Sequence, residues 1–264
     1  MSTAWRLIDS GPCSASYNMA LDEAIASAVR SHESPPTLRF YGWDSPSLSL
    51  GCFQKASDLD LVYCREQGIP VVRRQSGGRA ILHGDELTYS FSVRTDREPF
   101  SKGLLESYRS ISNAFSLAFR KIGVHVESKK QKERGRVLTR SPLCFQASSY
   151  GEILINNRKI VGSAQKRWED GLLQQGTIPY AYDKEKMRRV FGMREPPEAK
   201  DRMTALKEII SDFDDAKFRN AVKEAFEDTF GVSLPVSHPT EEEAHLTREL
   251  EQGKYRLESW NLRL

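Results

Sequence analysis

The sequence predicts an α+β fold in which a mixed, largely antiparallel β-sheet is flanked by helices, with a small helical segment at the C-terminal end. Short β-rich runs follow one another closely enough to pair as hairpins, and helical runs fall between groups of these strands. Neither an internal repeat nor a regular β–α–β alternation is present. The 264 residues are enough to bury a substantial core in one large domain, or in one domain with an appendage.

The first half of the chain predicts one long helix, one short helix and a series of strands. Residues 17–29 place apolar side chains at helical spacing, and Pro35 and Pro36 exclude a continuation of this helix. The shorter helix is expected over residues 59–68. β-Rich runs bounded by turn residues predict strands at 37–43, 47–53, 69–74 and 87–93, with a glycine-bearing loop at 75–86.

The second half predicts a strong helix, a hairpin and a helical end. Apolar periodicity predicts the helix at residues 104–123. Two runs, 151–156 and 159–165, predict a hairpin about Asn156 and Asn157, because asparagine tolerates the left-handed backbone of such turns. The other expectations are a basic mobile loop at 128–142, a strand at 172–180, a linker at 194–202, and helices at 183–192, 213–231 and 241–257.

Composition and charge place the chain among ordinary globular proteins. It is 39% hydrophobic and 28% charged, with a mean hydropathy of −0.55, and no apolar run is long enough to cross a bilayer. The N-terminus lacks a secretory apolar region, so we expect a cytoplasmic protein without membrane attachment. A net charge of +3 does not demand a nucleic-acid partner, and none is expected. Four widely spaced cysteines without a CxxC pair argue against a disulfide framework or a metal site.

A glycine-rich segment, RRQSGGRAILHG from Arg73, is the first candidate for ligand contact. Gly77 and Gly78 allow the backbone to approach a ligand closely, and the flanking arginines are suited to an anionic group. The segment is neither a P-loop nor a dinucleotide fingerprint, because the required spacings are absent. By itself it is more typical of a plain loop between two strands with solvated arginines. His83, just beyond it, is by itself typical of a hydrogen-bonded structural histidine.

The second candidate is a thiol followed fifteen positions later by a lysine. Cys144 lies between Leu143 and Phe145, which favours a buried structural role, yet it also follows the basic loop and a proline. Lys159 lies just past the predicted hairpin turn and is followed by small residues, which mark close approach of a ligand or backbone. A thiol beside an ammonium is a plausible pair for covalent catalysis, because the thiolate is the nucleophile. The residues alone leave both interpretations open.

Together these segments resemble the biotin/lipoate protein ligase superfamily, and within it the octanoyltransferase branch of LipM type. The resemblance covers about residues 5–195 and is strongest in RRQSGGRAILHGDELTYS, NRKIVGSAQKR and GLLQQGTIP. ATP-dependent lipoate ligases of the superfamily usually carry Asn-Asp near the start of the hairpin, where this chain reads Ser-Tyr-Gly-Glu. A cysteine before the hairpin, as in SPLCF here, is typical of the LipM type.

The resemblance implies an octanoyl-[acyl carrier protein]:protein N-octanoyltransferase without cofactor or metal, acting as a monomer. Cys144 would carry the acyl group as a thioester, and Lys159 would lower the pKa of its thiol and contact the acyl carbonyl. Octanoyl-acyl carrier protein would be the donor. The acceptor would be a lipoyl-domain protein, such as glycine cleavage H protein or a 2-oxoacid dehydrogenase E2. The implied substrate-binding residues are Arg73, Ser76, Gly77, Gly78, Arg79, His83, Gly162, Ser163 and Ala164.

Residues 1–196 are expected to form the catalytic domain, and 197–264 a helical segment that packs on it or extends it. The resemblance further implies that the loop at 76–83 and the hairpin around 162–164 line an apolar tunnel for the eight-carbon chain. Three alternatives remain open: an ATP-dependent lipoate-protein ligase, an amidotransferase that moves octanoyl between lipoyl-domain proteins, and a non-enzymatic binding protein on the same fold. The basic loop is expected either to attract acidic partners or to be merely solvated.

Overall fold

In a computed structural model of the protein, residues 3–128, 152–192 and 203–264 are described. Three predicted features lie outside these residues: the basic loop beyond Ser128, the Cys144 segment and the linker at 194–202. The helices are α1 (Ala15–Arg30), α2 (Leu61–Glu66), α3 (Leu104–Lys121), α4 (Lys184–Val190), α5 (Asp215–Phe230), α6 (Glu241–Leu250) and α7 (Glu258–Asn261). The strands are β1 (Thr3–Ala4), β2 (Arg6–Cys13), β3 (Thr37–Trp43), β4 (Ser47–Leu50), β5 (Val71–Arg73), β6 (Ile81–His83), β7 (Glu86–Arg94), β8 (Glu127–Ser128), β9 (Ile153–Ile155), β10 (Arg158–Lys159), β11 (Gly162–Arg167), β12 (Gly171–Pro179), β13 (Val232–Ser233) and β14 (Val236–Ser237).

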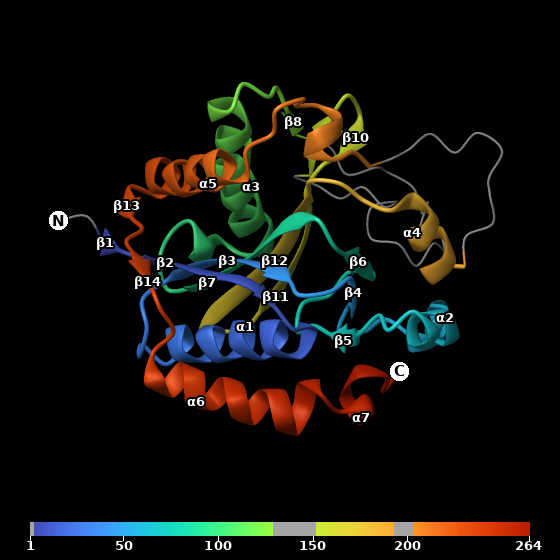
Figure 1. Ribbon diagram of the computed structural model, residues 1–264. Helices are drawn as coiled ribbons and strands as arrows, with labels where there is room; N and C mark the ends of the chain where they lie inside the picture. The colour runs from blue at the N-terminus through green and yellow to red at the C-terminus, as the bar shows by residue number, and fades with distance from the viewer. Residues whose placement is uncertain (1–2, 129–151, 193–202) are drawn as a thin grey trace.

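A six-stranded sheet in the order β11-β12-β7-β3-β2-β14 forms the centre of the molecule (Figure 1). The pairs from β11 to β3 are antiparallel, whereas β2 runs parallel to both β3 and β14. Strands β7 and β12 are buried along almost their whole length, as expected for the middle of a sheet covered on both faces. The predicted mixed, largely antiparallel α+β fold is confirmed.

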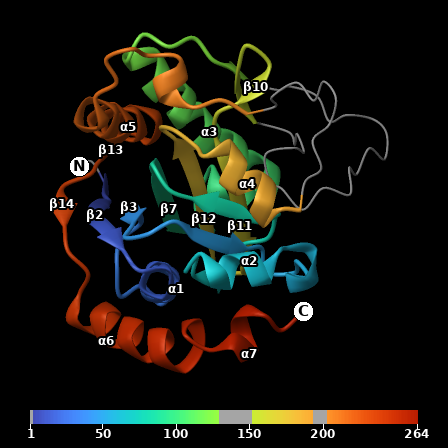
Figure 2. The same ribbon diagram turned by 45° about the vertical axis from the view of Figure 1, so that its right-hand side comes forward.

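Helices cover both faces of this sheet and create two apolar layers. On one face, α3 and α5 pack against each other and bury a cluster of aromatic rings that includes Phe91, Phe115 and Phe226. On the other face lies α1, and α6 packs outside α1 (Figures 1 and 2). Local signals fix the helix ends: Ser14 caps the first turn of α1, and Gly231 ends α5 in the left-handed conformation.

The C-terminal segment joins the main sheet and the N-terminal strand. β14 pairs with β2, and the short strand β13 pairs with β1. Arg6 on β2 forms a buried ion pair with Glu243 on α6, so a charged strand residue is matched by a charged helix residue inside the protein. The expected division between residues 196 and 197 stays a prediction.

Two smaller sheets carry the segments that the sequence singled out. The order β5-β4-β6 places the strands on both sides of the glycine loop next to β4, and α2 and α4 pack on this sheet. The order β10-β9-β8 contains the predicted hairpin. Asn156 and Asn157 adopt φ values of 51° and 60°, the left-handed turn conformation expected for them.

Several strand assignments differ from the sequence prediction; the short strands β1, β8, β13 and β14 were not predicted, and three further differences are larger. β2 was not predicted, because Asp9, Gly11 and Pro12 interrupt its apolar pattern; the structure accommodates them with a register shift between Asp9 and Pro12. Residues 81–83 were taken as loop but form β6. The predicted strand 159–165 is broken at residues 160–161, so its two halves belong to different sheets.

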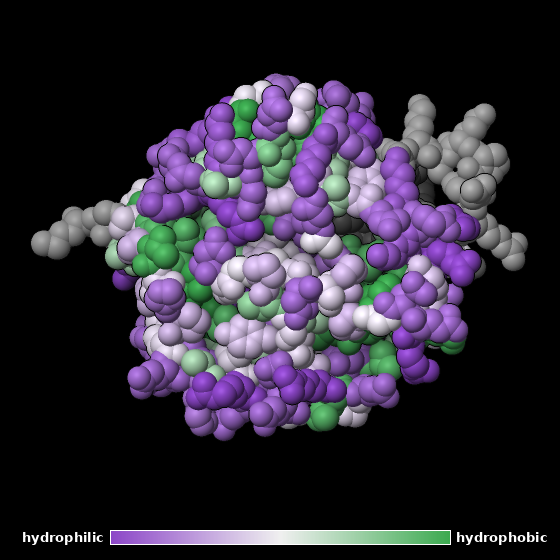
Figure 3. Space-filling model, viewed as in Figure 1, coloured by the Kyte–Doolittle hydropathy of each residue, from purple (hydrophilic) through white to green (hydrophobic). Residues whose placement is uncertain are grey.

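Hydrophilic side chains cover most of the face shown in Figure 3, and hydrophobic side chains gather there in smaller separate patches. Among the described residues, no helix is long and apolar enough to span a membrane. Within the same residues, no group of three or more His, Cys, Asp or Glu side chains is placed to hold a metal ion.

Candidate active site

The hairpin places Lys159 in the protein interior beside a carboxylate. Lys159 pairs with Leu154 across the hairpin, and its carbonyl accepts a hydrogen bond of 3.0 Å from the Thr204 amide. Its Nζ donates to Oε1 of Glu152 at 2.7 Å, and the two side chains are only 6% and 2% exposed. The other carboxylate oxygen of Glu152 has no hydrogen-bond partner among the described residues. A buried ion pair between Lys159 and Glu152 therefore lies at the start of the hairpin, and one carboxylate oxygen of Glu152 accepts no hydrogen bond from the described residues.

The glycine loop is held from beneath by Arg74. One guanidinium nitrogen donates to the carbonyls of Gly77 and Arg79, each at 2.8 Å, and the other donates to the carbonyl and the hydroxyl of Ser49. Gly78 has φ 84°, so a side chain there would strain the loop. The loop conformation thus depends on one buried arginine that lies directly under it.

The glycine loop meets β11, the strand that follows the hairpin. A Cβ placed on Gly78 would lie 3.5 Å from Cβ of Ala164 on β11. Ser76 donates to Gln175 on the neighbouring strand β12 at 2.7 Å. Ser163, in turn, hydrogen-bonds the hydroxyl of Tyr89 at 2.8 Å. The structure therefore brings Ser76, Gly78, Ser163 and Ala164 together, and their contact with substrate stays a prediction.

Arg73, the other arginine of the motif, is directed elsewhere. It is fully buried, and its guanidinium donates to the carbonyls of Gly51, Gln54 and Asn261. Its backbone amide also donates to the side chain of Asn261. These bonds tie β5 to the C-terminal end of the chain. The predicted substrate contacts of Arg73 and of the half-buried Arg79 stay predictions.

His83 lies in a buried hydrogen-bonded network. Its Nδ1 is 2.6 Å from Oε1 of Glu86, and its Nε2 is 2.7 Å from the hydroxyl of Ser49. Its ring stacks on Trp43 with centroids 4.0 Å apart. The same Glu86 oxygen accepts from Thr88 at 2.5 Å and from the Trp43 indole at 3.2 Å. The sequence did not single out Ser49 or Glu86, although the three-residue spacing from His83 to Glu86 was visible.

Burial raises the pKa of Glu86, but the charge of His83 and hydrogen bonds from His83, Thr88 and Thr177 lower it more. The net result is a pKa below the ordinary value of 4.5, so this buried carboxyl is ionised at neutral pH. An ionised Glu86 accepts a hydrogen bond from Nδ1–H of His83 and fixes the orientation of the ring.

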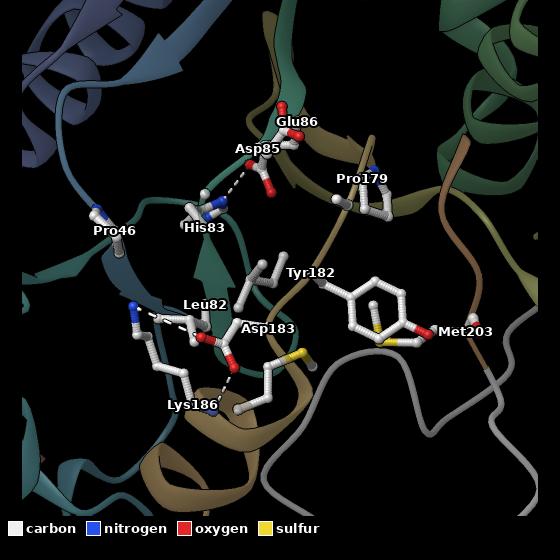
Figure 4. A pocket seen from close by; sticks show the side chains of 14 residues that line it. Pro46, Leu82, His83, Asp85, Glu86, Pro179, Tyr182, Asp183, Lys186 and Met203 are labelled. Carbon is white, nitrogen blue, oxygen red and sulfur yellow. Dashed lines mark hydrogen bonds and ion pairs between the residues drawn. The ribbon is translucent and has the colours of Figure 1, made fainter. Parts of the chain in front are cut away.

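Two cavities border His83. The larger, of about 350 Å³, lies between the β6–β7 turn, the end of β12 and α4; Figure 4 shows His83 and Glu86 on its wall, with Tyr182 and Met203 on another side. The smaller holds only about 20 Å³. It lies between the loop and the hairpin, where the acyl tunnel was expected, and has room for about one water molecule. It is lined by Met19, Tyr41, Trp43, Ser49, Arg74, Ile81, His83, Thr88, Ser163, Ala164, Gln175 and Gly176.

Three of the four cysteines lie in the described residues. Burial raises the pKa of Cys64 to about 11, and burial is also the main cause of the raised pKa of Cys13. Cys52 is buried, with its sulfur 3.4 Å from the Arg263 guanidinium. Cys144 lies outside the described residues, so its role as nucleophile stays a prediction.

Comparison with known proteins gives consistent matches over most of the chain. Residues 14–227 match the lipoyl protein ligase A/B catalytic domain. A protein named octanoyltransferase LipM from Lysinibacillus sphaericus is 38% identical over 278 residues, which cover 99% of each chain. One of the same name from Carboxydothermus hydrogenoformans is 38% identical and covers 98% of each. A crystal structure of lipoate-protein ligase A bound with ATP superimposes with a TM-score of 0.81 at 26% identity, covering 98% of both chains.

Proposed function

The chain belongs to the lipoyl protein ligase A/B catalytic domain family, and we propose that within this family it is an octanoyltransferase of the LipM type. As such it is an acyltransferase that moves an octanoyl group onto a lysine of a lipoyl domain in lipoate biosynthesis. The observation that carries the proposal is the similarity, along nearly the whole chain, to proteins named octanoyltransferase LipM.

The first step of the proposed reaction is transfer between two sulfur atoms. The thiolate of Cys144 attacks the thioester carbonyl of octanoyl-acyl carrier protein, a new C–S bond forms, the C–S bond to the carrier breaks, and the carrier leaves as its thiolate, which takes a proton from solvent. One thioester replaces another, so the step needs no ATP. Because a free cysteine has a pKa of about 8.5, a nearby ammonium increases the thiolate fraction at neutral pH.

The second step forms an amide. The amine of an acceptor lysine attacks the octanoyl thioester on Cys144, the C–N bond forms, and the C–S bond breaks. The acceptor is a lipoyl-domain protein, either glycine cleavage H protein or a 2-oxoacid dehydrogenase E2. A lysine amine has an ordinary pKa of about 10.4 and must lose a proton before it attacks.

We assign to Lys159 the stabilisation of the negative charge that develops on the carbonyl oxygen in both steps. Each step passes through an oxyanion, and preorganised donors stabilise such an intermediate without reorganisation. The ion pair with Glu152 and the bond from Thr204 fix the position of Lys159 before substrate arrives. Its ammonium is buried, so its field is less screened there than at the surface.

The glycine loop and the hairpin strand supply the acyl site of this proposal. Gly77, Gly78 and Ala164 present little side-chain bulk, which suits close approach of an alkyl chain. In the described structure the cavity between them is too small for eight carbons. Binding of the acyl chain therefore requires the apolar side chains that line it to move apart.

An ATP-dependent lipoate ligase is the second candidate, favoured by the similarity of the fold to lipoate-protein ligase A. The two functions differ in the need for ATP and for Cys144. The test is to incubate the pure protein with octanoyl-acyl carrier protein, without ATP, and to measure its intact mass. We expect an octanoyl adduct that is lost in Cys144→Ala and kept in the matched control Cys13→Ser. ATP-dependent lipoylation that survives in Cys144→Ala, with no adduct in the wild type, would contradict the proposal.

A further inference from the structure

A buried serine, histidine and glutamate lie in series beside the proposed acyl site. Ser49 on β4, His83 on β6 and Glu86 on β7 are all more than nine-tenths buried. The links are 2.7 Å from Ser49 to His83 and 2.6 Å from His83 to Glu86. Three strands thus place three polar side chains in a row, next to buried apolar clusters that include Leu48, Ile81 and Trp43.

The hydrogen bonds define the direction of this series. Glu86 is ionised and can only accept, so Nδ1 of His83 carries a proton and donates it. When the ring is neutral, Nε2 bears the lone pair and the hydroxyl of Ser49, 2.7 Å away, donates to it. The Ser49 oxygen itself accepts from Arg74 at 3.1 Å. With a neutral His83 every donor in the series points toward Glu86, which is the arrangement that moves a proton inward.

The open end of the series faces the proposed acyl site. Ser49 and His83 both line the small cavity, together with Ser163 and Ala164 of the hairpin strand. That cavity is large enough for about one water molecule. A proton released into this cavity would therefore meet the hydroxyl of Ser49 on its wall.

We propose that Ser49, His83 and Glu86 form a proton relay for the second transfer, with His83 as proton acceptor and Glu86 as the residue that positions it. The proposal rests on the octanoyl transfer proposed above and supplies its missing base. The acceptor ammonium gives one proton through Ser49 to Nε2 of His83, and the imidazolium formed is stabilised by Glu86. The neutral amine attacks the thioester carbon, Cys144 leaves as thiolate, and the second amine proton passes to that sulfur.

The relay acts on amine attack and not on formation of the acyl-enzyme, because exchange between two thioesters releases no amine proton. The two half-reactions therefore separate a relay from a merely structural network. A structural defect slows both steps, whereas loss of the relay slows only the second.

The test uses the full chain, first acylated by octanoyl-acyl carrier protein and then mixed with a lipoyl domain in single-turnover experiments across pH. His83→Asn keeps an amide donor for Glu86 and removes the base, so we expect amine attack to slow by about 10²-fold. Glu86→Gln keeps an acceptor for Nδ1 but removes the charge that favours imidazolium. We expect its rate to be lower and the inflection of its pH–rate profile to lie about one unit or more lower.

The control is Asp85→Asn, which removes the neighbouring carboxylate. Asp85 is half exposed and paired with Lys207 at 2.7 Å, so we expect its pH inflection to match the wild type. In Asp85→Asn the acylation rate should stay within about twofold of the wild type, and in His83→Asn and Glu86→Gln acylation should slow far less than amine attack, since the first step needs no relay. The charged and titratable groups around His83 are Glu86, Arg74, Asp85, Tyr182, Asp183 and Lys186, and Glu86 is the one that bonds to its ring.

The outcomes distinguish the relay from the function on which it rests. A wild type that forms no octanoyl adduct overturns the octanoyl transfer and the relay with it. An adduct that forms normally, with equal pH inflections in wild type and Glu86→Gln, overturns the relay and leaves the transfer standing. Equal slowing of both half-reactions in His83→Asn also overturns it, because that result assigns the network to structure alone.

Discussion

The buried pair of Lys159 and Glu152 makes a quantitative prediction about stability that is separate from catalysis. Lys159→Met removes the ammonium and leaves the carboxylate of Glu152 inside the protein, with neither oxygen paired by the lysine. The chain must then either bury an uncompensated charge or protonate it. The double variant Lys159→Met/Glu152→Met removes both charges and retains similar volume.

The structure allows the magnitudes to be stated. The two side chains are 6% and 2% exposed, so the interaction belongs to the buried class and not to the weak surface class. Removal of one partner from such a pair costs about 3–5 kcal/mol, whereas replacement of both is often close to neutral. For a chain of this size the single variant should unfold at a Tm lower by roughly 6–20 °C.

The assay combines urea or thermal unfolding with the octanoyl-adduct measurement on the same four proteins: the wild type, the two single variants and the double variant. We expect the double variant to recover most of the stability lost in Lys159→Met and none of the adduct formation. A single variant as stable as the wild type would refute the buried-pair reasoning. A double variant that recovers both stability and acylation would instead refute the catalytic role of Lys159.

Two further predictions follow from the described geometry. Because the folded protein lowers the pKa of Glu86, the ionised carboxylate stabilises the fold fully above its ordinary pKa of 4.5, and this stabilisation is lost as the pH falls through the folded pKa. The free energies of unfolding of wild type and Glu86→Gln, measured in urea, should therefore converge below about pH 4.5. Gly51→Ala places a Cβ 1.9 Å from the carbonyl oxygen of Gly78, so the glycine loop must shift, and we expect the free energy of unfolding to fall by about 1–3 kcal/mol or more. The control is Gly253→Ala, where the added Cβ meets no atom within 4 Å and the free energy of unfolding should be nearly unchanged.

Local sequence signals predicted most of the fold because they act over a few residues. The hairpin at Asn156 and Asn157 followed from the conformational tolerance of asparagine, and the end of α5 followed from Gly231. β2 escaped prediction because its pairing depends on distant partners. Arg6 at its start is neutralised by Glu243, 237 residues further along the chain. No window of the sequence contains that contact.

The sequence predicted where the candidate site lies, but not the hydrogen bonds that link its residues. The glycine loop and the small residues after Lys159 pointed to two segments, and the structure brings these segments into contact at Gly78 and Ala164. Ser49 was hidden, because one serine in an alternating strand carries no signal of its own. It becomes notable only when β4 is placed beside β6 and its hydroxyl reaches His83.

The two adjacent arginines of the motif show why residue type does not determine role. Arg73 is the last residue of β5, and Arg74 follows it with its amide bonded to the carbonyl of Leu50 on β4, so the extended backbone directs their side chains to opposite faces. One face is directed to the C-terminal end of the chain, where Arg73 binds the carbonyl of Asn261. The other is directed to the glycine loop, where Arg74 binds Gly77 and Ser49. The direction in which the extended backbone points each side chain, and not the charge they share, therefore decides that Arg73 stabilises the fold and Arg74 stabilises the site. By the same reasoning Arg74 is the motif arginine whose loss should disturb both the loop and the proposed relay, because it donates to each.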